Sequence, residues 1–250
     1  MQSFDLKIQP WRARPGFTLV EMIVVIAIIA VLATAGMIGL GGTGGKSVTS
    51  AVATTESLFN EARELAVTKN LRTCVLIAEN LTNNSAENLR RMVVAYEETN
   101  DDGTAKDPNN ATPNWTLSSR GVTLPEQTFF SQKFSRKNHQ AAPPLNPDGT
   151  NPNDIATTSA LTAAKAAYQG TYYKYVFNNQ GICDTPGASV VIGSGARNLK
   201  SSTDKPVVTS AGQRDFGGFV VWRNGQTSVF RNPSQISSRI SSLATGKDPF

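Results

Sequence analysis

The 250-residue sequence contains very few of the side chains that carry out catalysis or bind metals. It has one histidine, two cysteines and 17% charged residues. No nucleophile, base and acid can be grouped around His139, which follows a lysine and an asparagine in a polar stretch. One histidine and two widely separated cysteines also fit no zinc-binding pattern. From these shortages we expect neither an enzyme nor a bound metal or other cofactor.

Positive charge is modest as well. The formal net charge is +5, and part of it comes from basic residues in the first sixteen positions: Lys7, Arg12 and Arg14. The other basic residues form no stripe interleaved with aromatic side chains, which is the pattern expected of a nucleic-acid-binding surface. The sequence therefore predicts no nucleic-acid partner.

The aspartates at 101, 102 and 107 lie in a stretch rich in Asn, Gly and Pro. Their oxygens could bind calcium, but their spacing fits no defined calcium-binding loop. Turn formation explains the same residues without a metal, because Asp and Asn side chains hydrogen-bond to the backbone two residues further on.

The two cysteines, Cys74 and Cys183, allow two interpretations. In an exported domain two cysteines can form one disulfide. Alternatively, each is a separate buried thiol that packs as a small apolar side chain. The sequence is compatible with both.

One feature is abundant, a long apolar run near the N-terminus. Between Phe17 and Leu40 the only polar side chains are Thr18, Glu21 and Thr34. A helix of residues 17–40 would be about 36 Å long, which exceeds the roughly 30 Å thickness of a bilayer's hydrocarbon core. The basic residues before the run keep the N-terminus in the cytoplasm by the positive-inside rule. We therefore expect one transmembrane helix followed by an exported domain.

Three kinds of N-terminal segment contain such a run. The first is a plain signal anchor, and the second is a secretory signal peptide cut after the small residues Ala33-Thr34-Ala35. The third has a leader that is cut on the cytoplasmic side, before the run. Glu21 favours the third, because a carboxylate costs on the order of 3 kcal/mol near the bilayer centre and neither of the others needs it. Cleavage after Gly16 would give Phe17 a free amine, which can neutralise Glu21 of a neighbouring subunit.

These residues also carry a family resemblance. The sequence Arg14-Pro15-Gly16-Phe17-Thr18-Leu19-Val20-Glu21-Met22 closely resembles the processing site of type IV prepilins and type II secretion pseudopilins. The resemblance implies that a prepilin peptidase cuts between Gly16 and Phe17 and methylates Phe17. It also implies that Glu21 is the carboxylate used in assembly.

After the run, the pattern predicts a glycine-rich joint and then a helix. Six glycines between Gly36 and Gly45 weaken a continuous helix, and we place the joint at residues 41–46. From Ser47 to Asn70 apolar residues recur every three or four positions, which indicates an amphipathic helix lying against a sheet.

Strands are predicted after this helix. The β-prone runs are Thr73–Ala78, Met92–Tyr96, Val122–Leu124, Thr128–Phe134, Thr171–Asn178 and Ala188–Ile192. Asn224-Gly225 predicts a hairpin between Phe219–Arg223 and Thr227–Arg231. Residues 99–152 are dominated by loop-forming residues. After the hairpin, Asn232 and Pro233 can start a short helix whose one face carries Ile236, Ile240 and Leu243.

A second resemblance points to the H-type minor pseudopilins. Those proteins carry an alanine-arginine-x-x-alanine stretch at the end of their long helix, and Ala62, Arg63 and Ala66 match it. Phe177 and Gly181, which precede an apolar strand, look like the same group's C-terminal sheet. We interpret Arg63 and its neighbour Glu64 as an ordinary solvated helical face.

These observations predict the α+β class, with a long N-terminal transmembrane and spine helix packed on a C-terminal antiparallel β-sheet domain. The expected organisation is a cytoplasmic leader at 1–16, a transmembrane assembly helix at 17–40, the joint at 41–46 and a periplasmic pilin-like domain at 47–250.

By resemblance, the expected function is that of a structural subunit, a pilin or minor pseudopilin, in a type II secretion or type IV pilus-like filament. The implied partners are a prepilin peptidase, other pilin or pseudopilin subunits, the inner-membrane assembly platform and membrane lipid. The expected location is the inner membrane, crossed once, with the N-terminus in the cytoplasm. The alternative is a membrane-tethered extracytoplasmic binding module that joins no filament, which would keep its leader and bind a specific ligand.

Overall fold

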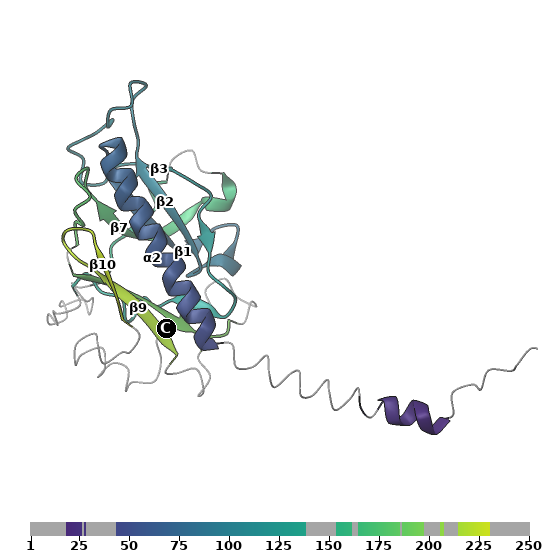
Figure 1. The fold of residues 1–250 in the computed structure, drawn as a ribbon. Coiled ribbons are helices and arrows are strands. Elements are labelled where there is room, and N and C mark those ends of the chain that lie inside the picture. The colour runs from purple at the N-terminus through teal and green to yellow at the C-terminus, as the bar shows by residue number, and fades with distance from the viewer. Residues whose placement is uncertain are drawn as a thin grey trace, which may run out of the picture. The chain divides into compact units, whose positions relative to one another are not determined.

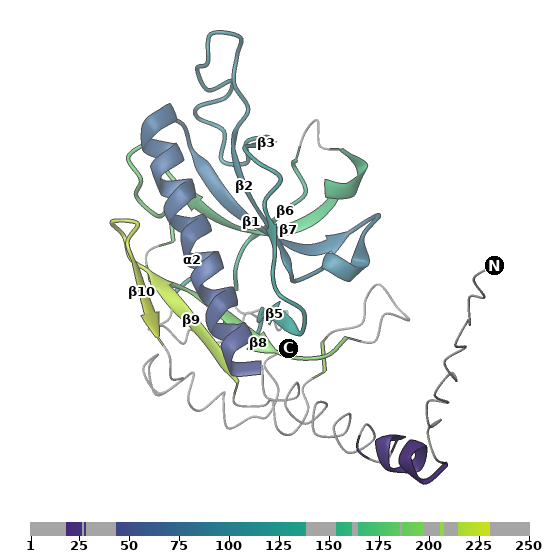
Figure 2. The same ribbon diagram turned by 45° about the vertical axis from the view of Figure 1, so that its right-hand side comes forward.

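The computed structural model describes residues 19–26, 28, 44–138, 154–161, 165–185, 187–197, 206–207 and 215–230. The chain forms two compact units, Met1–Gly42 and Thr43–Phe250. In the first unit, residues 19–26 and 28 are helical. The second unit, called the head below, places one long helix on two antiparallel sheets (Figure 1, Figure 2). The predicted α+β class is therefore confirmed.

Helix α2 of the head spans Gly44–Lys69, so it begins before the start predicted at Ser47. Its apolar stripe is buried, as the three- and four-residue spacing predicts: the fully buried members include Ala51, Thr55, Phe59, Ala62 and Ala66. The helix ends where Asn70 takes a left-handed conformation with φ of 54°. The Leu71 amide then donates to the Ala66 carbonyl at 3.2 Å, which closes the last turn.

The larger sheet has six strands in the order β3-β2-β1-β7-β6, with β4 beside β2. Its strands are β1 (Thr73–Leu81), β2 (Arg91–Glu97), β3 (Trp115–Leu117), β4 (Val122–Thr123), β6 (Thr157–Thr158) and β7 (Gly170–Phe177). Val75 in β1 lies opposite Val94 in β2 and Tyr175 in β7. The first two predicted strands therefore pair with each other, in antiparallel orientation. Two short 3-10 turns, η1 (Ser85–Glu87) and η2 (Ala166–Tyr168), lie in the connections.

The smaller sheet has four strands in the order β10-β9-β8-β5. These are β5 (Thr128–Phe130), β8 (Ala188–Ser194), β9 (Phe216–Val221) and β10 (Thr227–Phe230). The predicted hairpin joins β9 and β10, and Val221 pairs with Thr227. Its turn is tightened because the Gly225 amide donates to the Trp222 carbonyl at 2.9 Å.

Among the described residues of the head, three apolar clusters form its core. The main cluster lies between α2 and the inner faces of both sheets, and Phe59 of α2 meets the rings of Tyr175 and Phe219 at 5.1 and 5.0 Å between centroids. A second cluster, around Trp115 and Tyr172, covers the other face of the larger sheet. The third, around Phe134 and Phe216, contains one residue of β8 and two of β9. Successive side chains of β1 point to opposite faces of the sheet, so Val75 packs in the first cluster and Cys74 packs in the second.

Candidate functional site

The N-terminal helical segment, residues 19–26 and 28, exposes its apolar side chains on all sides. Of the twelve large apolar side chains that are exposed in the described residues, eight belong to this segment, with Leu19 76%, Ile26 64% and Ile23 58% exposed. Burying one such side chain is worth about 1.5–3 kcal/mol. A helix that is apolar all round is stable when other apolar groups surround it completely. The described segment therefore presents an apolar surface that it does not bury by itself.

Glu21 is the only charged residue of this segment, and its side chain lies at the helix surface among these apolar side chains. The segment therefore combines one carboxylate with a continuous apolar surface. The predicted cleavage site, Gly16 and Phe17, lies outside the described residues, as does His139. Within the described ranges, which break at residue 27 and from 29 to 43, no helix has the length and hydropathy needed to cross a membrane.

The Cys74–Cys183 disulfide raised as one of two interpretations is not formed; both cysteines are free, buried thiols. The physical reason is the strand alternation of β1. Cys74 points into the cluster around Trp115, whereas Cys183 belongs to the main core beneath α2. Burial raises the pKa of both thiols and so disfavours the reactive thiolate form. The second interpretation, two separate buried thiols, is correct.

Arg63 of α2 is only partly exposed, so it is less solvated than predicted, whereas its neighbour Glu64 is exposed. The Arg63 Nε atom is buried and has no hydrogen-bond partner among the described residues. Its side chain packs against two glycines that both have positive φ, Gly181 at 73° and Gly225 at 74°. A Cβ on Gly225 would lie 2.7 Å from Arg63 Cδ and 2.3 Å from the Gly181 carbonyl oxygen. Arg63 therefore joins the last part of α2 to the turn before Cys183 and to the β9–β10 hairpin.

The loop after β2 is held by one buried ion pair. The Arg72 guanidinium donates to the Glu97 carboxylate at 2.7 Å, and the Glu97 side chain is only 5% exposed. The same guanidinium donates to the backbone carbonyls of Asn110 at 2.7 Å and Asp107 at 3.2 Å. These bonds fix residues 98–114 against the end of α2.

Asp102 in this loop acts as a turn residue. Its carboxylate accepts bonds from the backbone amide and the hydroxyl of Thr104, which lower its pKa. In the part of the chain that the structure describes, no group of three or more Asp, Glu, His or Cys side chains is arranged to bind a metal. The described geometry thus supplies a folded head and an apolar N-terminal surface with one carboxylate.

Comparison with known proteins adds three findings. The family model described as the prokaryotic N-terminal methylation motif matches residues 11–37, a range that contains Gly16, Phe17 and Glu21. No curated protein matches the chain. Among solved structures, the chain is similar to the crystal structure of the type IV minor pilin FimU of Pseudomonas aeruginosa (strain PAO1). That match has 9% sequence identity and a TM-score of 0.33, and it covers 75% of this chain and 91% of the other.

Proposed function

We propose that this type IV pilin-like chain is a structural subunit that assembles into a filament through its N-terminal helix. The methylation motif at residues 11–37 supports a structural subunit rather than an enzyme. The observation that carries the proposal is the exposed apolar segment with Glu21 as its single charge. A filament core of packed helices would bury that segment, and a neighbour's amine would neutralise the carboxylate.

In this proposal, the precursor is held in the inner membrane by residues 17–40, with the leader at 1–16 in the cytoplasm and the head in the periplasm. A prepilin peptidase cuts after Gly16 and methylates the new N-terminus at Phe17. The amine of one subunit then pairs with Glu21 of the next, which gives this carboxylate a cationic partner in an apolar environment. Assembly replaces lipid contacts with helix–helix contacts, and the inner-membrane platform supplies neighbouring subunits.

The finer assignment that we propose is a minor pseudopilin of a type II secretion filament. It is supported by the resemblance of Ala62, Arg63 and Ala66, together with Phe177 and Gly181, to the H-type group. In the head, Arg63 and Gly181 are in contact, so two parts of that pattern meet in space. A type IV pilus is the other machine in which such a subunit would assemble, and the same N-terminal chemistry would serve it.

The proposal is tested by incorporation into filaments. The full-length chain with an epitope tag is expressed alongside a prepilin peptidase, an assembly platform and partner pilins, and sheared filaments are collected by centrifugation. We expect the tagged chain in the filament fraction and its loss from that fraction in Glu21→Val. Glu64→Gln is the matched control, because Glu64 is an exposed carboxylate on α2 and its loss should leave incorporation unchanged.

The tethered binding module predicts a different result. In that case the wild-type chain would stay in the membrane fraction, with its leader intact, whether or not filaments form. Equal incorporation of the wild type and Glu21→Val would instead remove Glu21 from the assembly mechanism.

A further inference from the structure

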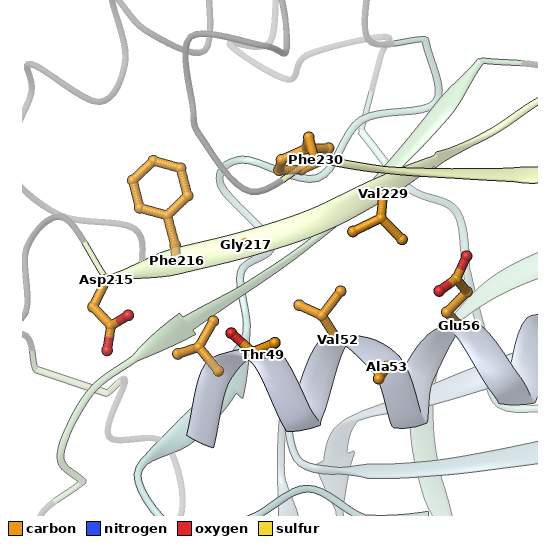
Figure 3. A pocket seen from close by; sticks show the side chains of 10 residues that line it. Thr49, Val52, Ala53, Glu56, Asp215, Phe216, Gly217, Val229 and Phe230 are labelled. Carbon is orange, nitrogen blue, oxygen red and sulfur yellow. The ribbon is translucent and has the colours of Figure 1, made fainter. Parts of the chain in front are cut away.

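The head has a groove of about 540 Å³ between the first half of α2 and the β9–β10 hairpin (Figure 3). Val52 projects into it from α2, and Val229 projects toward the helix from β10. The Glu56 carboxylate of this groove accepts a hydrogen bond from the Thr227 hydroxyl at 2.6 Å, which joins the helix to the hairpin. Glu56 therefore has a structural role and marks no ligand site.

A smaller pocket of about 170 Å³ lies on the face of the larger sheet that does not meet α2. Lys174 and Val176 of β7 line this pocket, and Val176 packs against the second apolar cluster. Pro113, Trp115 and Ala156 add apolar wall, and Trp115 is almost fully buried. Pockets that hold drug-sized ligands have volumes of about 300–1,000 Å³, so this pocket suits a much smaller molecule.

Two oppositely charged side chains of the pocket have no partner among the described residues. The Lys174 ammonium and the Asp184 carboxylate make neither an ion pair nor a side-chain hydrogen bond there. Burial raises the pKa of Asp184, and the cations of Arg72 and Lys174 lower it only in part. Burial likewise raises the pKa of the Cys74 thiol and Lys174 lowers it in part, so the ammonium lies close to the sheet. Both charges therefore act near the pocket and contact no opposite charge.

The backbone fixes the segments that carry these two charges. The Lys174 amide donates to the Ala156 carbonyl at 2.8 Å, and the Asp184 amide donates to the Val176 carbonyl at 2.9 Å. Both bonds are made along β7, so the two charged residues and the apolar wall belong to one rigid frame.

The third charged residue of the lining, Arg72, is already used by the fold. Its guanidinium donates to the Glu97 carboxylate and to two backbone carbonyls of the loop after β2. The charges of Arg72 and Glu97 offset each other. One ammonium and one carboxylate, those of Lys174 and Asp184, are thus left for a ligand.

We propose that this pocket binds a free α-amino acid with a small apolar side chain. The ligand's carboxylate accepts from the Lys174 ammonium, its ammonium donates to the Asp184 carboxylate, and its side chain packs against Val176 and Ala156. A ligand with only one charge would leave Lys174 or Asp184 without a partner, and an uncharged ligand would desolvate both. A ligand that carries both charges satisfies the pair, and an amino acid is small enough for the volume.

The test follows the indole N–H signals of the isotope-labelled full-length chain in detergent by NMR. The chain has three tryptophans, and Trp115→Phe and Trp222→Phe assign the two signals from the head. Trp115 lies at the pocket, whereas Trp222 donates its indole N–H to Ser228 in the β9–β10 hairpin. We expect L-valine to shift the Trp115 signal saturably and to leave the Trp222 signal in place.

Two analogues remove one charge each. L-Valinamide lacks the carboxylate and N-acetyl-L-valine lacks the ammonium, and each should bind at least about tenfold more weakly because it loses a bond between charged groups. Lys174→Gln should lose only the preference for L-valine over L-valinamide, and Asp184→Asn should lose only the preference over N-acetyl-L-valine. Lys165→Gln and Asp101→Asn change exposed charges outside the pocket and are the matched controls, which should keep both preferences.

An unchanged Trp222 signal shows that a variant is folded. The absence of a saturable shift at Trp115 would overturn the proposal and leave Lys174 and Asp184 as solvated surface charges. Equal binding of the three compounds would also overturn it, and so would pocket variants that keep both preferences. The titration reads the head alone, so its result does not depend on whether the chain enters filaments.

Discussion

The two α-helical segments among the described residues differ in how their apolar side chains are buried. In the N-terminal segment, apolar side chains such as Leu19 and Ile23 are exposed on every side. In α2, a single stripe that includes Ala51 and Phe59 is fully buried, and acidic residues such as Glu61 occupy the outer side. The first pattern leaves burial to be completed by other molecules, whereas the second completes it within the head. We therefore expect assembly and folding to depend on separate segments, so that each substitution affects one property and spares the other.

The largest effect on folding is expected from Phe59→Ala. Phe59 is fully buried, and its ring contacts Tyr175, Phe177 and Phe219. Removing it should lower the free energy of unfolding by about 3–5 kcal/mol, because it leaves a cavity under α2. Denaturant unfolding of the full-length chain in detergent, followed by circular dichroism, measures this loss. Val67→Ala on the same helix is the control, because Val67 is 56% exposed and should cost far less; similar losses would contradict the proposed core.

Gly225→Ala should be the next most damaging substitution. Gly225 has φ of 74°, and an added Cβ would lie 2.3 Å from the Gly181 carbonyl oxygen. The left-handed conformation alone costs about 1–2 kcal/mol for a residue with a side chain, and the clash adds to that cost. Gly103→Ala separates the two effects, because Gly103 has φ of 82° and open space around its Cβ position. If both variants lost the same stability, the contact between the hairpin and Gly181 would be unimportant.

A smaller, pH-dependent effect is expected at Asp184. Burial raises its pKa, and the cations of Arg72 and Lys174 offset only part of that shift. A raised folded pKa gives a stability contribution that is complete below the unfolded pKa and is lost as the pH rises through the folded pKa. Asp184→Asn should therefore stabilise the head relative to wild type more at pH 7 than at pH 3, as thermal unfolding at the two pH values would show.

Glu98 should show the opposite pH dependence in the same thermal-unfolding assay. Bonds from Lys106 and Asn114 lower its pKa, so its contribution exists above the unfolded pKa and is lost as the pH falls. Glu98→Gln should lower the melting temperature slightly at pH 7 and leave it unchanged at pH 3. The same pH trend in both variants would contradict the assigned causes.

The smallest effect on folding should come from Glu21→Val. Glu21 belongs to the unit Met1–Gly42, so the substitution should change the unfolding free energy of the head by less than about 0.5 kcal/mol. The same denaturant experiment measures it, with Phe59→Ala as the reference for a true folding defect. A clear loss of head stability would show that the two segments are not independent.

Much of the head could be predicted because local patterns and packing agree there. The spacing of Ala51, Phe59 and Ala62 predicted the buried face of α2, and Asn224-Gly225 predicted the β9–β10 hairpin. The division of the strands between two sheets was not predicted, because strand runs do not say which partners they take. Strand β3 was not predicted either, because Trp115 is flanked by Asn, Pro and Thr, which are common in loops. The segment becomes a strand because it pairs with β2.

Only part of the candidate site could be predicted from the sequence. Glu21 could be recognised because a carboxylate within an apolar run costs free energy in any apolar environment. Arg63 could not be recognised, because its burial depends on Gly181 and Gly225, which are distant in sequence. The sequence did not decide whether the two cysteines form a disulfide, for the same reason. Whether they meet depends on which face of β1 carries Cys74.

Cleavage after Gly16 can be checked by the intact mass and N-terminal sequence of the full-length protein recovered from membranes that contain a prepilin peptidase. We expect a chain that begins at Phe17 with a methylated amine. A chain that still begins at Met1 would contradict it and leave a plain membrane anchor. A chain that begins at Gly36 would also contradict it, because Ala33-Thr34-Ala35 would then be the cleavage site of a secretory signal peptide.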